Sequence, residues 1–456
     1  MKPDAKSTQS EKSSRRDFLK WSGKVAAGSA LAGVTIPHVH AAEDNTIRLA
    51  LIGCGGRGSG AVANALESPN GPCKLVAMAD LFEKRLEGSH KVLSSKFPGM
   101  VDVPKERRFV GFDAFKKAID CLRPGIDVAM ACTYPAFRVC HLDYAVQKGV
   151  HCFMEKSFAT DPPDVRRIIA AGEAAKKKNL KIAAGLMCRH SVNRQELIKR
   201  IKDGQLGPLQ IIRAYRMEPV GPMAPKRPAD MTELLWQIRN SVRFYWVSGG
   251  LWAEMDIHQI DEICWLKDSY PVSAHGICGR AVNSKDPGQG LDSFSVEYTF
   301  EDGTKAYDVV RYIPKCYPEF ATYVAGTKKS AQFSGAIHVG TVRTYKDLRI
   351  SKDNIEWEAP PEQYTCWQAE WNVLLNSIRK DLYQNEAERA AKSNLADIMG
   401  RAAMHMGRVV TWDEAMKSNF KWCPDIDVVD YDTAAWVKAD ANGQYPVPVP
   451  GQWVEM

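Results

Sequence analysis

Two pairs of ionisable residues have the types and the spacing needed for proton transfer. Glu155 and Lys156 directly follow a short apolar run at 150–154, with no turn residue between. Glu254 and His258 are four residues apart, so on a helix they share one face. A lysine ammonium stabilises negative charge on a substrate oxygen, and a histidine carries the proton. We predict that Lys156, His258 and Glu254 are catalytic, that Glu155 holds Lys156, and that Glu254 orients His258 and raises its basicity.

Each pair also has a plainer interpretation. Glu155 and Lys156 could be the solvated end of a loop, and His258 could be a satisfied core histidine. A metal site of Glu254, His258 and Asp261 is a further alternative, but no other ligand cluster is evident in the sequence, and we expect no metal.

One more pair of residues could contact a substrate. Arg189 follows a predicted strand at 181–187, and Asp261 lies three residues after His258. Arg189 could bind a substrate oxygen or close a salt bridge. Both residues are candidate substrate-binding residues.

A glycine-rich segment, GCGGRG at 53–58, lies between a predicted strand at 46–52 and a helix-like segment at 61–66. In this context the G-x-G-x-x-G pattern is typical of dinucleotide binding, because glycines allow a tight turn and close approach of a pyrophosphate to a helix N-terminus. The cofactor-binding residues predicted here are Gly53, Gly55, Gly56, Arg57 and Gly58.

Asp80 ends a second predicted strand at 74–79. A carboxylate at this place accepts hydrogen bonds from an adenosine ribose and repels the 2′-phosphate of NADP. Two unit charges about 4 Å apart at an effective dielectric of ~20 repel by about 4 kcal/mol. We therefore predict NAD rather than NADP, although Lys84 and Arg85 could soften the preference, and Asp80 could instead cap a helix.

Further strands at 126–133 and 150–154 alternate with helical patterns, which is typical of a doubly wound parallel sheet. Ligands bind beyond the carboxyl ends of the strands in such sheets. Thr133 and Glu155 lie at these ends and are further cofactor-binding candidates, with Lys156 near the nicotinamide.

The second half of the chain has a different pattern. Strands are predicted at 294–300, 305–311 and 331–333, with a hairpin turn at Glu301-Asp302-Gly303, and helices at 367–380 and 387–409. A loop at 220–230 and a tail at 442–452 are rich in glycine and proline. The predicted fold class is α/β: an N-terminal Rossmann domain and a C-terminal α+β domain with a mostly antiparallel open sheet.

At this point the sequence resembles the Gfo/Idh/MocA family over roughly residues 46–450. The motifs that carry the resemblance are IGCGGRGSG at 52–60, MAD at 78–80, VHCFMEKSFATD at 150–161, LGPLQ at 206–210, YWVSGGLWAEMDIHQIDEICWL at 245–266 and NEAERAAKSNLADIMGRAAMHMGRVVTWDEA at 385–415.

The resemblance implies that Lys156 carries the chemistry, that Glu254 and His258 match the family's acid–histidine pair, and that the sheet of the second domain supports homo-oligomer contacts. Three departures stand out: Ser157 replaces a usual proline, Tyr134 and Arg138 replace a usual proline and histidine, and Glu254 replaces aspartate.

The first residues differ from the rest. Two arginines at 15–16 precede FLK, an uncharged stretch at 25–37 and a small-residue site near 41, the order of a twin-arginine export signal. Residues 1–24 hold seven basic and three acidic residues, so +4 of the net charge of +7 belongs to this segment. The small remainder argues against nucleic-acid binding. The twelve cysteines include no C-x-x-C pair, so no disulfide framework is indicated, and we predict no membrane span after residue 42.

These inferences combine into one expected organisation: an export signal at 1–42, an NAD-binding domain at 43–157, a substrate-binding domain at 158–425 and a C-terminal tail at 426–456, in a periplasmic protein. The expected activity is NAD-dependent oxidation of a sugar or polyol hydroxyl, with a tightly bound cofactor. The alternatives are a glycosidase, lyase or epimerase that uses NAD transiently, or a sugar-binding protein without catalysis.

Overall fold

The computed structural model describes residues 45–219, 225–282, 285–335, 338 and 342–456. The export signal expected at 1–42 lies outside these described residues. Among them, no helix has both the length and the apolar content that crossing a bilayer requires.

Six parallel strands form the first sheet, in the order β3-β2-β1-β4-β5-β6. The strands are β1 (Ile47–Ile52), β2 (Cys73–Asp80), β3 (Arg108–Val110), β4 (Val128–Ala131), β5 (His151–Met154) and β6 (Ile182–Ala184). Their order reverses between β1 and β4, so the carboxyl ends of these two strands flank a crevice of the kind that binds ligands. The predicted Rossmann sheet is confirmed.

Helices cover both faces of this sheet, which is why its strands are almost continuously apolar. The helices on one face are α2 (Gly56–Leu66), α3 (Glu83–Lys96) and α11 (Cys366–Arg379). Those on the other face are α4 (Ala114–Ile119), α5 (Pro135–Lys148) and α6 (Pro162–Lys177). Each group buries its own apolar cluster against the strands.

Nine strands form the second sheet, in the order β14-β13-β12-β11-β7-β10-β9-β8-β15. They are β7 (Leu209–Met217), β8 (Ser273–Gly279), β9 (Ser293–Thr299), β10 (Lys305–Arg311), β11 (Glu319–Gly326), β12 (Ser330–Ser334), β13 (Arg343–Tyr345), β14 (Ile355–Glu358) and β15 (Val410–Thr411). Only the β7–β10 pair is parallel, so the predicted mostly antiparallel sheet is confirmed. The predicted hairpin turn also joins β9 to β10.

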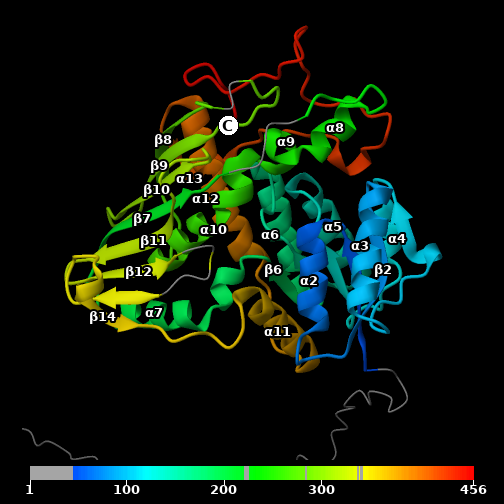
Figure 1. Cartoon of the computed structure of the whole chain (residues 1–456), viewed down its shortest axis with the longest axis horizontal. Coiled ribbons are helices and arrows are strands. Elements are labelled where there is room, and N and C mark those ends of the chain that lie inside the picture. Colours follow the sequence, from blue (N-terminus) through cyan, green and yellow to red (C-terminus); the bar gives the residue numbers. More distant parts are fainter. Residues whose placement is uncertain (1–44, 220–224, 283–284, 336–337, 339–341) are drawn as a thin grey trace, which may run out of the picture. The chain divides into compact units, whose positions relative to one another are not determined.

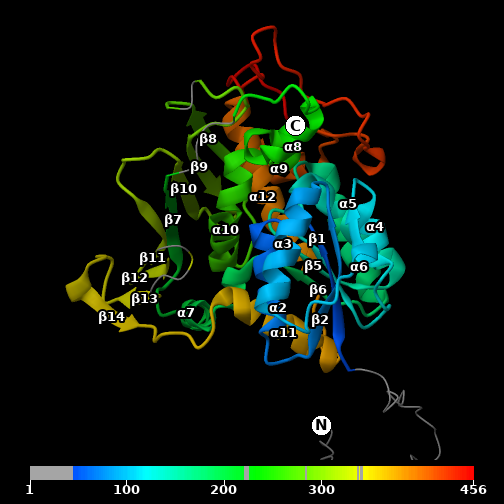
Figure 2. The same cartoon turned by 45° about the vertical axis from the view of Figure 1, so that its right-hand side comes forward.

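Two long helices, α10 (Gly250–Lys267) and α12 (Ala387–Met406), pack against the buried face of the second sheet, and α12 also packs against α6 (Figure 2). The start of α10 depends on glycine. Gly249 and Gly250 have φ angles of +79° and +81°. A Cβ on Gly250 would lie 2.6 Å from the Tyr245 ring, so the glycine pair lets α10 begin directly beside that ring.

The remaining helices are short, and they lie around the second sheet and at its junction with the first. They are α7 (Val192–Lys202), α8 (Glu233–Arg239), α9 (Tyr245–Ser248) and α13 (Trp412–Lys417), with 3₁₀ turns at Lys105–Arg107, Met187–His190, Ser241–Arg243, Lys352–Asn354 and Ile426–Val428.

Several predicted boundaries differ from the observed ones. The strand expected at 181–187 ends at Ala184, and the chain then forms the 3₁₀ turn Met187–His190. Because β6 belongs to the first sheet, that sheet continues past residue 157, where we placed the domain boundary. The described part of the 220–230 loop and the tail at 442–452 contain no helix or strand, as expected.

Candidate active site

The glycine-rich segment turns sharply between β1 and α2, and its glycines divide into two groups. A Cβ on Gly53, which has φ +98°, would lie 2.6 Å from the carbonyl carbon of Cys132. A Cβ on Gly58 would lie 2.2 Å from the Gly53 oxygen. At Gly55 and Gly56 a Cβ would meet no described atom within 4 Å. Gly53 and Gly58 are therefore needed for chain packing. Gly55 and Gly56 leave open space at the start of α2, where a pyrophosphate would fit.

Asp80 is held rigidly at the end of β2. Its two carboxylate oxygens accept hydrogen bonds from the backbone N–H groups of Cys54 at 2.7 Å and Phe82 at 2.8 Å. Burial raises the pKa of Asp80, and these two hydrogen bonds oppose the rise. The residue that caps α3 is Phe82, so the alternative of Asp80 as a helix cap is wrong.

A pocket of about 520 Å³, which includes space open to solvent, lies beside Asp80. Its lining includes Thr133 and three residues that the sequence analysis did not predict as cofactor contacts: Phe112, Tyr134 and Arg85. The Arg85 guanidinium donates to the Tyr134 hydroxyl at 3.2 Å. Aromatic walls with one fixed carboxylate suit an adenosine, so the residues present fit a dinucleotide.

Glu155 does not pair with the Lys156 ammonium, but its Oε2 accepts a hydrogen bond from the backbone N–H of Lys156 at 3.3 Å. The Glu155 carboxylate forms an ion pair with Arg57 at 2.8 Å, and its side chain is almost fully buried. Arg57 belongs to the glycine-rich segment, so this pair ties the end of β5 to the start of α2.

Lys156 pairs instead with Glu254 on α10. The Nζ–Oε1 distance is 3.1 Å, and Nζ also donates to the backbone carbonyl of Glu254. The two side chains keep 15% and 19% of their surface exposed, so a substrate can reach them. The Lys156–Ser157 peptide bond is cis, and the Ser157 hydroxyl donates to the carbonyl of Ala253. The Arg138 guanidinium donates to the Ser157 carbonyl.

His258 lies one turn after Glu254, but Glu254 does not orient it, contrary to our prediction. Nδ1 of His258 has no hydrogen-bond partner among the described residues. The ring packs against His338, with centroids 4.3 Å apart. Burial, followed by the nearby His338 and Lys156, holds the pKa of His258 well below its usual range. A pKa below the usual range is the opposite of the raised basicity that we predicted for His258.

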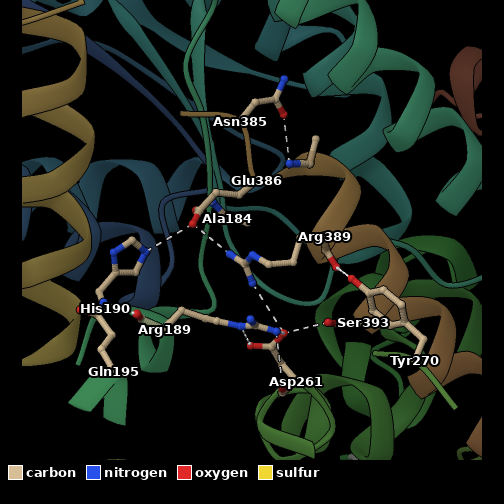
Figure 3. A network of polar contacts seen from close by, with 11 residues as sticks. Ala184, Arg189, His190, Gln195, Asp261, Tyr270, Asn385, Glu386, Arg389 and Ser393 are labelled. Atoms are coloured by element: carbon tan, nitrogen blue, oxygen red, sulfur yellow. Dashed lines mark hydrogen bonds and ion pairs between the residues drawn. The ribbon is translucent and has the colours of Figure 1, made fainter. Parts of the chain in front are cut away.

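Arg189 and Asp261 bind each other (Figure 3). Two Arg189 nitrogens each lie 2.8 Å from an Asp261 oxygen, and the Ser393 hydroxyl donates to the same carboxylate at 2.7 Å. Burial alone would raise the pKa of Asp261, but the Arg189 guanidinium outweighs it and holds the pKa below the usual range. The structure has the salt bridge, and this geometry does not support a substrate contact for either residue.

The same network extends to the loop before α12. Arg389 lies 3.6 Å from Asp261 and 2.9 Å from Glu386, and Glu386 lies 3.6 Å from His190. The backbone N–H of Ala184 also donates to Glu386. This network therefore joins the end of β6 to α10 and α12, which positions the helix that carries Glu254 and His258.

Sequence reasoning missed two residues at the site, Cys188 and His338. One ligand atom from each of them and one from His258 all lie within 4.8 Å of one another. His338 lies in a segment with no periodic pattern, and Cys188 adjoins the more conspicuous Arg189. The metal set that we considered, Glu254, His258 and Asp261, is not the set that the described structure brings together.

A Rossmann sheet followed by an open, mostly antiparallel sheet, with a lysine–glutamate pair at their junction, defines a two-domain α/β protein with a dinucleotide site. No protein-family model matches the chain. A glycosyl hydrolase family 109 protein of Streptomyces coelicolor is 23% identical over 450 residues, which cover 90% of this chain and 84% of that protein. An inositol 2-dehydrogenase of Cereibacter sphaeroides is 28% identical over 36% of this chain and 41% of its own length.

Two solved structures have the same fold. The aldose-aldose oxidoreductase of Caulobacter crescentus, complexed with glycerol, has a TM-score of 0.61 and 19% identity, over 80% of this chain and 99% of its own. The scyllo-inositol dehydrogenase of Lactobacillus casei, with NAD(H) and scyllo-inositol bound, has a TM-score of 0.59 and 21% identity, over 81% of this chain and 99% of its own. These relatives are of the Gfo/Idh/MocA type, so the resemblance is confirmed.

Proposed function

We propose that the protein is an NAD-dependent oxidoreductase that acts on a hydroxyl of a sugar or polyol. One observation carries the proposal. Lys156 pairs with Glu254 at a partly exposed position, and its neighbour Glu155 is bonded to Arg57 of the glycine-rich segment. These contacts support a proton-transferring role for Lys156 near the proposed nucleotide site, as this chemistry requires.

The cofactor side of the proposal depends on Asp80 and the glycine-rich segment. Gly55 and Gly56 would face the pyrophosphate, and the Asp80 carboxylate would accept hydrogen bonds from the ribose hydroxyls of the adenosine. Arg57 and Glu155 would fix the loop, and Thr133 would lie beside the bound nucleotide. The fixed negative charge of Asp80 favours NAD over NADP.

On the substrate side, each group has a distinct role. A bound nicotinamide supplies a hydride acceptor. The Lys156 ammonium donates a hydrogen bond to the substrate oxygen and stabilises the alkoxide that develops there, while Glu254 holds the ammonium in place. The neutral imidazole of His258 accepts the hydroxyl proton. The substrate hydroxyl therefore has to lie between these two side chains.

A second candidate function follows from the relative that covers 90% of the chain, a glycosyl hydrolase family 109 protein. In that case oxidation of the sugar would be transient. It would acidify a neighbouring C–H bond, elimination would break the glycosidic bond, water would add to the resulting double bond, and the hydride would return. The same residues would act, and no net NADH would accumulate. An inactive protein that still binds sugars would instead indicate a sugar-binding function.

The experiment is a turnover assay of the purified full chain. Sugars and polyols are offered with NAD, and aryl glycosides are offered without added reductant. Accumulating NADH supports the dehydrogenase, and release of the aryl group without net NADH supports the glycosidase. His258→Ala should lower kcat by about 10²–10⁴-fold, as loss of a general base does. Activity in neither assay would contradict both candidate functions.

We further propose that NAD(H) stays bound between cycles. Free NAD is scarce outside the cytoplasm, and the twin-arginine route carries folded proteins that could load the nucleotide first. Retention on dilution requires an affinity near 1 nM, about −12 kcal/mol, with slow release. Nucleotide that survives extensive dialysis would support this proposal, whereas an empty protein that needs millimolar NAD would contradict it.

A further inference from the structure

Cys188, His258 and His338 form a buried cluster, and the proposed oxidoreductase function uses only His258 of these three residues. They come from three places: the 3₁₀ turn after β6, helix α10, and the segment between β12 and β13. Their exposed fractions are 1%, 5% and 6%. The Cys188 Sγ lies 3.7 Å from Nδ1 of His338, and one ligand atom from each of the three residues lies within 4.8 Å of the others.

The donor atoms are available for a ligand. Nδ1 of His258 is buried and has no hydrogen-bond partner among the described residues. An unpaired buried polar atom is costly, which indicates that something else satisfies it.

One of the three distances between the ligand atoms is close to that of a tetrahedral ion, and the other two are at most 4.8 Å. With a Zn–S bond of about 2.3 Å and a Zn–N bond of about 2.0–2.1 Å, the sulfur and nitrogen of a tetrahedral site lie about 3.5 Å apart. The observed sulfur–nitrogen distance of 3.7 Å needs only a small adjustment. Three protein ligands would leave a fourth position open, as catalytic zinc sites do.

The surroundings hold one ligand in place. The Arg194 guanidinium donates to the backbone carbonyl of His338 at 2.8 Å and lies 3.5 Å from Glu262. Glu262 also accepts hydrogen bonds from Thr322 and Ser334. This buried network fixes the His338 backbone, in the way that outer residues support metal ligands.

Nearby charges of both signs face the cluster. Lys156 and Arg216 donate to the backbone carbonyls of Glu254 and Met255, one turn before His258 on α10, and Arg194 donates to the carbonyl of His338. The carboxylates of Glu254, Glu218 and Glu262 pair with these three cations in turn. The cations are thus largely compensated, so a bound cation would not face three uncompensated positive charges.

One of the three residues, His338, adjoins an open pocket. His338 and Arg194 line an open pocket of about 880 Å³ together with Ser191, Asn193 and Glu362. An ion could therefore reach the cluster in the folded protein without unfolding of the surrounding helices and strands.

We propose that Cys188, His258 and His338 bind a zinc ion, with the fourth position open to a water or substrate oxygen. A thiolate and two imidazoles are the donors that zinc prefers over magnesium or calcium. Binding releases the Cys188 thiol proton to solvent, because the thiolate is the ligand. While His258 binds zinc, its lone pair cannot also accept the hydroxyl proton, so the zinc-bound form excludes the role of His258 as general base. Zinc binding is measured without nucleotide or substrate, so its outcome is separate from that of the turnover assay.

The test is metal binding to the full chain, prepared without an affinity tag and stripped with a chelator. We expect one Zn²⁺ per chain in a titration against a chromophoric chelator. Co²⁺, as a spectroscopic probe, should give the absorption of a cobalt–thiolate bond. Cys188→Ser should abolish that band, and Cys188→Ser and His338→Ala should each weaken Zn²⁺ binding by at least about a hundredfold.

The matched control is Cys264→Ser, which changes another buried thiol on α10 that lies outside the cluster. It should bind Zn²⁺ as the wild type does, and circular dichroism should show that all the variants fold. A wild-type protein without the cobalt–thiolate band would overturn the proposal even if the variants were to unfold. Binding of copper but not zinc or cobalt, or Zn²⁺ binding that survives in Cys188→Ser, would overturn it as well.

Discussion

Replacing Asp80 with alanine should change which nucleotide the protein prefers. The carboxylate is fixed by the N–H groups of Cys54 and Phe82, so it cannot turn away from a 2′-phosphate. At about 4 Å and an effective dielectric of ~20, the repulsion is about 4 kcal/mol. Solvent reduces this value, and one third of it still corresponds to about tenfold in affinity. In Asp80→Ala, bound NAD also loses the charge-assisted hydrogen bonds from its ribose hydroxyls to the carboxylate, worth about 1.5–3 kcal/mol.

The substitution also leaves two N–H groups without their acceptor, at a cost of about 1–3 kcal/mol each, and a loosened loop would weaken both nucleotides. The ratio of the two dissociation constants cancels this common loss, so it is the quantity to measure. We expect the preference for NAD over NADP to fall by at least about tenfold in calorimetric titrations. Asp113→Ala, which removes an exposed carboxylate, serves as the control. The reasoning would be refuted if the ratio in Asp80→Ala stayed at the wild-type value, or if the wild type preferred NADP.

Two further predictions concern the glycine-rich segment and the end of the chain. Gly58→Ala places a methyl group 2.2 Å from the Gly53 oxygen and should lower the free energy of unfolding by about 1–3 kcal/mol, measured by denaturant unfolding. Gly56→Ala should instead weaken NAD binding, measured by nucleotide titration, with little loss of stability. Glu455 is buried against Arg401 and His405, and although burial raises its pKa, these partners lower it to about 2 from 4.5. Because the pKa of Glu455 is depressed in the folded state, its ionised form should add about 3 kcal/mol to the free energy of unfolding above about pH 4.5. This contribution is lost as the pH falls toward 2. Glu455→Gln should therefore flatten the fall in stability between these pH values. An unchanged slope in Glu455→Gln would contradict that assignment.

The parts of the site that the sequence predicted are those specified by local patterns. The strand–glycine–helix order and Asp80 at the end of β2 depend on residues close to one another in the chain, and the structure has both. The hairpin at Glu301-Asp302-Gly303 is equally local.

The ion-pair partners of Glu155 and Lys156 could not be predicted from the sequence, because they depend on distances across the fold. Glu155 is next to Lys156 in sequence, yet its carboxylate turns to Arg57, while Lys156 turns to Glu254, 98 residues away. Side chains of consecutive residues at a strand end point in different directions, so adjacency alone misled us. His338 had no signal, because it lies 150 residues from Cys188 and outside any periodic pattern.

The most direct test of the central claim is a single turnover with one equivalent of NAD and excess sugar or polyol, comparing the wild type with Lys156→Ala. Lys91→Ala, a change of an exposed lysine on α3, is the control. The account predicts that all three proteins bind NAD equally. The near-ultraviolet absorbance of reduced nicotinamide should appear rapidly in the wild type and in Lys91→Ala, and hardly at all in Lys156→Ala. For the glycosidase alternative the substrate is an aryl glycoside, and release of its aryl group should show the same dependence on Lys156. Equal rates in Lys156→Ala and the wild type would contradict the account.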